Sequence, residues 1–218
     1  MFYYDIHTHH DISDAEVISI KNVIAGRDPI PSKPYFSIGV HPWYLNKDAL
    51  DVVTQNIQKN NCLALGEAGL DAMPQIVNQF NLDLQQDYFI KQVELSEAYA
   101  KPLIIHCVKC FDKLLHLKKI LKPKQFWISH GFQKNKELAE QLIKAGFYLS
   151  FGAALFNSKN AQASLKTMPI NRLFFETDSQ TNYNIKSIYQ QASFLLSLDL
   201  EDLKQHIASN FQNVFLSK

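Results

Sequence analysis

The chain opens with two histidines spaced for metal binding. His7 and His9 follow an apolar run at the amino end, and alternate side chains of a β-strand point to the same face, so both imidazoles can bind one ion. Further along, short apolar stretches each end at another ligand-type residue: Glu67, His106, His130 and Asp178. These residue types are ligands of divalent metals, and we therefore predict a metal site.

The number of candidate ligands indicates two ions. A tetrahedral zinc site takes three or four protein ligands, and this chain offers six. We expect His7, His9 and Asp178 to bind one ion. His106 and His130 are expected to bind the other, with Glu67 as a bridge between the two. Two such divalent ions lower the pKa of bound water and neutralise charge on a phosphoryl or carbonyl oxygen, which predicts hydrolysis. Zinc, manganese and magnesium stay open as the metal, with magnesium least suited to the histidine-rich position.

Strands are needed to position these ligands, and the chain alternates strand-like and helix-like segments. Eight apolar runs are predicted strands: 2–6, 17–23, 35–40, 62–66, 103–105, 126–129, 147–151 and 173–175. Helical spacing appears at 49–59, 82–100, 112–121, 136–145 and 161–167, and twice more within 185–218. This alternation predicts an α/β fold with a parallel sheet, a TIM-type (β/α)8 barrel. The candidate ligands fall at the carboxyl ends of the strands, where such barrels carry their active sites.

The segment between the second and third predicted strands is short and rich in proline. Pro29, Pro31 and Pro34 exclude a helix there. The pattern is compatible with a barrel that lacks an early helix. A chain of 218 residues with 46% hydrophobic content can bury one core, so we expect a single hydrolase domain over residues 1–218.

Charge and cysteine usage limit the partners and the compartment. The net charge is +1, from 22 basic and 21 acidic residues, so a polyanion must be held by local groups. Arg27 and Arg172 are the only arginines. Three cysteines are too few for a secreted disulfide framework, and neither a signal peptide nor a membrane span is evident. We expect a cytoplasmic protein with no membrane association, and nothing implies a protein partner.

Six motifs occur in order between residues 5 and 178. They are Asp5-Ile-His7-Thr-His9, Gly39-Val-His41-Pro42, Leu65-Gly-Glu67-Ala-Gly69-Leu-Asp71, Pro102-Leu-Ile-Ile-His106, His130-Gly-Phe132 and Glu176-Thr-Asp178. In order and spacing they resemble the TatD family of metal-dependent deoxyribonucleases, within the amidohydrolase superfamily. The resemblance implies a TIM-type barrel, two metals on the ligands above and phosphodiester hydrolysis in DNA. It also implies that Asp178 takes the proton from the attacking water, with Glu67 as the second catalytic residue.

Further residues are expected around the metals. His41, at the end of the third predicted strand, is expected to bind substrate or to support a metal ligand, and a loop-anchoring hydrogen bond is the alternative. Lys109 and Lys134 are expected to contact phosphate. The family usually has an arginine two residues after the ligand that corresponds to His106. This chain has Val108 at that position, followed by Lys109. Glu176 is expected to orient a metal ligand, and a purely structural role stays open.

Three functions fit this sequence. The first is a TatD-like deoxyribonuclease with DNA as its substrate. The second is an amidohydrolase-type enzyme that uses the same metals on a small amide, ester or cyclic amidine. The third is a non-catalytic homologue that binds nucleic acid, and the complete set of ligands argues against it.

Overall fold

The computed structural model describes residues 1–217. Its eight-stranded sheet follows the chain in order from β1 to β8. The strands are β1 (Tyr3–Thr8), β2 (Val17–Ile24), β3 (Tyr35–Gly39), β4 (Cys62–Asp71), β5 (Leu103–Val108), β6 (Trp127–Ser129), β7 (Tyr148–Phe151) and β8 (Leu173–Phe175). The pairs β1–β2, β3–β4, β4–β5 and β7–β8 are parallel.

The first strand also meets the chain that leaves the last strand. Thr8 forms a parallel bridge with Asp178. The Asp178 N–H donates to the His7 carbonyl at 2.9 Å, and the His9 N–H donates to the Asp178 carbonyl at 3.1 Å. Sequential strand order, parallel pairing and this bridge are the topology of a TIM-type (β/α)8 barrel, so the predicted fold class is confirmed.

Helices begin only after β3. They are α1 (Ala49–Asn56), α2 (Pro74–Val77), α3 (Leu82–Ala98), α4 (Phe111–Leu121), α5 (Lys136–Lys144), α6 (Ala154–Asn157), α7 (Lys159–Thr167), α8 (Ile185–Leu196) and α9 (Leu200–Phe211), with a 3-10 turn η1 (Ile170–Arg172) and a π-helical turn η2 (Gln212–Leu216). Between β2 and β3 the described chain has no helix, as the prolines predict, and none lies between β1 and β2. None of the helices within residues 1–217 has the length and hydropathy needed to cross a bilayer.

Strand β4 is longer than the sequence indicates. The expected strand 62–66 continues to Asp71, and all ten of its residues are buried. Glu67 therefore lies inside the strand and not after its end. Gly69 permits this continuation, because a Cβ at that position would lie 1.9 Å from the His106 carbonyl oxygen on β5.

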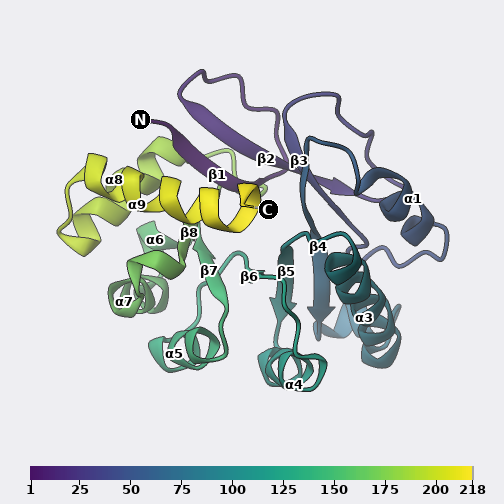
Figure 1. The fold of residues 1–218 in the computed structure, drawn as a ribbon. Helices are drawn as coiled ribbons and strands as arrows, with labels where there is room; N and C mark the ends of the chain where they lie inside the picture. The colour runs from purple at the N-terminus through teal and green to yellow at the C-terminus, as the bar shows by residue number, and fades with distance from the viewer. Residues whose placement is uncertain (218) are drawn as a thin grey trace. The chain divides into compact units, whose positions relative to one another are not determined.

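The contacts of the chain cluster into two compact units. Unit 1 joins Met1–Lys21 with the chain from Ser129 onward, and unit 2 is Asn22–Ile128. In unit 1, α8 and α9 pack beside β1 (Figure 1). In unit 2, α3 packs on β4, where the Gln85 side chain bonds both the N–H and the carbonyl of Asp71, at 2.7 and 3.1 Å. The single-domain organisation stays a prediction.

Candidate metal centre

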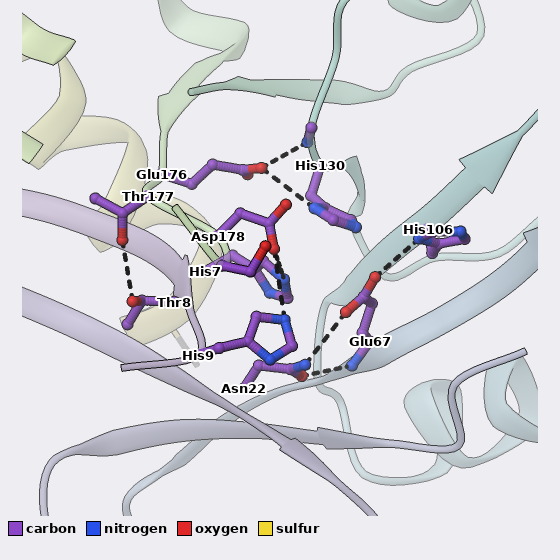
Figure 2. A network of polar contacts seen from close by, with 12 residues as sticks. His7, Thr8, His9, Asn22, Glu67, His106, His130, Glu176, Thr177 and Asp178 are labelled. Carbon is purple, nitrogen blue, oxygen red and sulfur yellow. Dashed lines mark hydrogen bonds and ion pairs between the residues drawn. The ribbon is translucent and has the colours of Figure 1, made fainter. Parts of the chain in front are cut away.

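In unit 1, the two histidines at the end of β1 meet the aspartate that follows β8. The Nε2 atom of His9 lies 3.5 Å from Oδ1 of Asp178, and that of His7 lies 3.8 Å from the same oxygen. Figure 2 shows the Asp178 side chain facing the two imidazoles. Asp178 has a left-handed φ of 53°, an uncommon conformation for a residue with a side chain. The structure thus brings these three predicted ligands together.

His130 is held in unit 1 by Glu176. Its Nδ1 lies 3.2 Å from Oε1 of Glu176, which also accepts a 2.6 Å hydrogen bond from the Gly131 N–H (Figure 2). A carboxylate on Nδ1 fixes the proton there and leaves the Nε2 lone pair for a metal. Burial raises the pKa of Glu176, but the charge and hydrogen bond of His130, with smaller contributions from His7 and Ser150, together lower it below the usual value. An ionised Glu176 is suited to orienting His130.

Asp5 fixes the backbone between Glu176 and Asp178, the two acidic residues that follow β8. Its Oδ2 accepts a 2.6 Å hydrogen bond from the Thr177 hydroxyl, and its Oδ1 accepts one from the Thr177 N–H at 3.1 Å. Thr177 stands between Glu176 and Asp178 in the chain. Burial raises the pKa of Asp5 to about 7, against the lowering effect of these hydrogen bonds. In the sequence, strand alternation puts Asp5 on the face of His7, which leaves an orienting and a purely structural role open.

In unit 2, Glu67 lies between two histidines and an asparagine. Its Oε1 is 3.2 Å from Nε2 of His41 and 2.9 Å from Nδ1 of His106. Its Oε2 accepts a hydrogen bond from the Asn22 side chain at 3.2 Å, while the Glu67 N–H donates to Asn22 Oδ1 at 3.0 Å (Figure 2). Asn22 on β2 thus fixes both the backbone and the carboxylate of Glu67. Asn22 belongs to none of the sequence motifs and was not predicted.

Asp71 holds the other side of the His106 ring. Its Oδ2 lies 3.0 Å from Nε2 of His106 and accepts a 2.6 Å hydrogen bond from the Trp43 indole. Burial raises the pKa of Asp71, but the hydrogen bonds from His106, Trp43 and the Met73 N–H, with the charge of His106, together lower it. A proton held on Nε2 by Asp71 would leave the Nδ1 lone pair directed at Glu67, so that His106 and Glu67 together would offer two donors to a cation.

His41 has a different geometry from the other histidines of the site. Its Nδ1 accepts a hydrogen bond from the Trp43 N–H at 3.1 Å, so its proton lies on Nε2, which faces Glu67. This arrangement makes His41 a donor that orients Glu67 and anchors its own loop. Its role in substrate binding stays a prediction.

The two lysines expected to bind phosphate lie at different strand ends. Lys109 is exposed and follows β5. Lys134 is half-buried, and its carbonyl accepts a 2.7 Å hydrogen bond from the Ser164 hydroxyl. Neither lysine forms an ion pair with any residue that the structure describes. Their contacts with phosphate stay predictions.

Both units offer the donor chemistry of a divalent metal. Within unit 1, potential ligand atoms lie within 4.8 Å of one another in the sets His7, His9 and Asp178, and His130, Glu176 and Asp178. Within unit 2, the same holds for His41, Glu67 and His106. Imidazole and carboxylate donors together suit zinc or manganese, so the residues present fit the expected ions. How the ions share the ligands, including a bridging Glu67, stays a prediction.

Comparisons with known proteins point to one family. The model of the family "TatD related DNase" matches residues 8–216. An uncharacterized metal-dependent hydrolase of Buchnera aphidicola subsp. Baizongia pistaciae is 34% identical; the match spans 66% of this chain and 55% of that protein. The uncharacterized metal-dependent hydrolase YcfH of Escherichia coli K12 is 26% identical over 91% of this chain and 78% of its own length.

Solved structures share the fold over nearly the whole chain. The crystal structure of YJJV, a TatD homologue from Escherichia coli K12, has a TM-score of 0.86 at 20% identity and covers 99% of this chain and 98% of its own. A TatD family hydrolase from Entamoeba histolytica has a TM-score of 0.80 at 18% identity, over 100% of this chain and 99% of its own.

Proposed function

Because the chain belongs to the TatD related DNase family of metal-dependent hydrolases, we propose that it cleaves phosphodiester bonds in DNA. The observation that carries the proposal is the convergence of imidazoles and carboxylates within each unit. In unit 1, His7 and His9 face Asp178. In unit 2, His106 faces Glu67.

Two divalent ions are proposed to be held by six side chains. These are His7, His9, His130 and Asp178 in unit 1, and Glu67 and His106 in unit 2. When bound, such ions lower the pKa of coordinated water and neutralise charge that develops on a phosphoryl oxygen. Glu176 and Asp71 keep the lone pairs of His130 and His106 available for them, through the hydrogen bonds on the other ring nitrogen.

Asp178 is proposed to take the proton from the attacking water. Two acids follow β8, and their exposure separates their roles. The Asp178 side chain is 36% exposed, whereas the Glu176 side chain is 1% exposed and bonded to His130. Water can reach Asp178 directly, while Glu176 is confined to positioning His130.

A cytoplasmic location and a DNA substrate complete the proposal. All three cysteines are free and buried, as suits a reducing compartment. With a net charge of +1, the protein needs local groups to hold DNA, and the exposed Lys109 beyond β5 is one candidate.

A nuclease assay tests this function. Treatment with a chelator should abolish cleavage of a single-stranded oligonucleotide, and added manganese should restore it. Glu67→Ala and Asp178→Ala should each lower kcat by roughly a hundredfold or more, since each removes a ligand and a catalytic group. Asp51→Ala, on the exposed face of α1, is the matched carboxylate control and should cleave normally.

The same assay separates the alternatives. Full turnover by the Glu67 or the Asp178 variant contradicts the proposal. Metal-dependent hydrolysis of small amides, esters or cyclic amidines without oligonucleotide cleavage assigns the site to the amidohydrolase alternative.

A further inference from the structure

A pocket in unit 2 contains one of the two arginines of the chain. It has a volume of about 320 Å³, and Arg27, Trp43, Tyr44, Asn46, Gln79 and Phe80 line it. We propose that this pocket binds a single-stranded nucleic acid, with Arg27 on a backbone phosphate and Trp43 against a neighbouring base. The inference rests on the proposed function and assigns residues to its substrate.

The pocket is built from loops that leave the carboxyl ends of neighbouring strands. Arg27 follows β2, and Trp43 and Tyr44 follow β3. The two loops are tied together where they begin, because the Ala25 N–H donates to the Gly39 carbonyl at 2.9 Å. In a parallel sheet these ends carry the active site, so the pocket opens on the side where substrate is expected.

The guanidinium of Arg27 is positioned and available. It lies 3.9 Å from the centre of the Tyr44 ring, and it forms no ion pair within the described chain. The adjacent Asp28 carboxylate instead accepts a 2.8 Å hydrogen bond from the Ile24 N–H. Stacking on Tyr44 fixes the guanidinium plane and leaves its N–H edges for a phosphate, which arginine can bind with two parallel hydrogen bonds.

Trp43 connects this pocket to the metal-binding residues of unit 2. Its indole N–H donates to Asp71, and the same carboxylate oxygen holds His106. Trp43 is nevertheless 39% exposed. An exposed ring with a fixed edge is a suitable stacking platform for a base.

The chemistry of the pocket selects among the candidate substrates. A guanidinium beside an exposed indole matches the alternation of phosphate and base along a nucleic acid strand. A small amide or cyclic amidine has no phosphate for Arg27. Arginine at this position also supplies a bidentate phosphate contact, which Val108 cannot provide beside His106.

Binding to metal-free protein tests the inference without catalysis. The probe is a fluorescein-labelled dT12 oligonucleotide followed by anisotropy. Arg27→Ala should raise its Kd by about tenfold or more, since it removes a charge-assisted phosphate contact. The slope of log Kd against log salt should also become shallower by about 0.7, because one phosphate contact is lost from a single strand. Arg27→Lys keeps the charge but not the planar guanidinium group. Its Kd for dT12 should lie between those of the wild type and of Arg27→Ala.

Arg172→Ala is the matched control. Arg172 ends η1, ahead of β8, and lies 4.8 Å from the centre of the Tyr148 ring. Arg172 therefore shares the cation–π arrangement of Arg27. It lies at the amino end of its strand, however, whereas Arg27 lies at the carboxyl end, where substrate is expected. Arg172→Ala should therefore bind dT12 like the wild type. Equal dT12 binding by wild type, Arg27→Ala and Arg27→Lys overturns the inference.

Turnover with manganese separates this inference from the proposed function. Arg27→Ala should raise the KM for oligonucleotide cleavage and leave hydrolysis of bis(p-nitrophenyl) phosphate unchanged, because that ester has no flanking nucleotide. Equal losses on both substrates assign Arg27 a structural role and overturn the inference. If the wild type hydrolyses neither compound yet binds dT12 through Arg27, the proposed function fails and the inference stands.

Discussion

The residues that orient the candidate ligands follow a common rule. The Nδ1 atom of His130 lies 3.2 Å from a carboxylate oxygen of Glu176. Similarly, Nε2 of His106 lies 3.0 Å from a carboxylate oxygen of Asp71. A carboxylate at that position fixes the tautomer and raises the basicity of the nitrogen left for a metal. Glu176 was predicted as an orienting residue because strand alternation puts it on the face of Asp178. Asp71 was visible in the sequence only as the last residue of a motif.

Asp71→Asn should weaken metal binding. The substitution keeps the size of the side chain but removes the charge that polarises His106, and such outer partners change metal affinity by about 10- to 100-fold. We expect a loss of about tenfold in manganese affinity, measured by competition with a fluorescent chelator. Asp51→Asn, on exposed α1, should have no effect. An unchanged manganese affinity in Asp71→Asn would mean that the Asp71 carboxylate only holds the Trp43 indole and does not act on the metal through His106.

Among the elements, strands were predicted better than short helices. Every predicted strand is present, because buried parallel strands are short apolar runs bounded by turn residues. The four-residue helices α2 and α6 were not predicted, since a single turn has no periodicity to detect. The extension of β4 through Glu67 was also missed, because Ala68 and Gly69 resemble a loop until the close approach to β5 is known.

Gly69→Ala tests the close contact of β4 and β5. The added Cβ would lie 1.9 Å from the His106 carbonyl oxygen, and the glycine has a φ of 154°, which residues with side chains avoid. We expect the free energy of unfolding to fall by about 3 kcal/mol or more, the range of severe packing defects, as measured by urea titration.

Gly146→Ala is the control for this change. Gly146 also has a positive φ, of 83°, but a Cβ there would meet nothing within 4 Å. The loss should therefore be about 1 kcal/mol, from the backbone conformation alone. Similar losses for both variants would show that strain in the φ angle, rather than contact with β5, determines the effect at Gly69.

For the molecule as a whole, the ligand types were predictable, whereas of the residues that hydrogen-bond to them only Glu176 was predicted mainly as an orienting residue. Strand ends and residue chemistry point to His7, His9, Glu67, His106, His130 and Asp178. Asn22 supports Glu67 across 45 positions of sequence, and a single sequence has no signal for such a pair. The pocket around Arg27 likewise depends on three segments of the chain that only the fold brings together.

Metal should stabilise the whole chain, because its proposed ligands come from widely separated segments that meet only when the protein is folded. An ion that binds the native state alone adds about 2.7 kcal/mol at a hundred times its Kd. For a chain of 218 residues, that corresponds to a rise in Tm of roughly 5 to 10 °C. Thermal unfolding with manganese, compared with chelator, measures this shift.

Asp178→Asn and Glu67→Gln should each reduce the shift, since each removes a ligand from one unit and leaves the other unit's donors in place. A full shift in both variants would mean that manganese stabilises the protein through other groups.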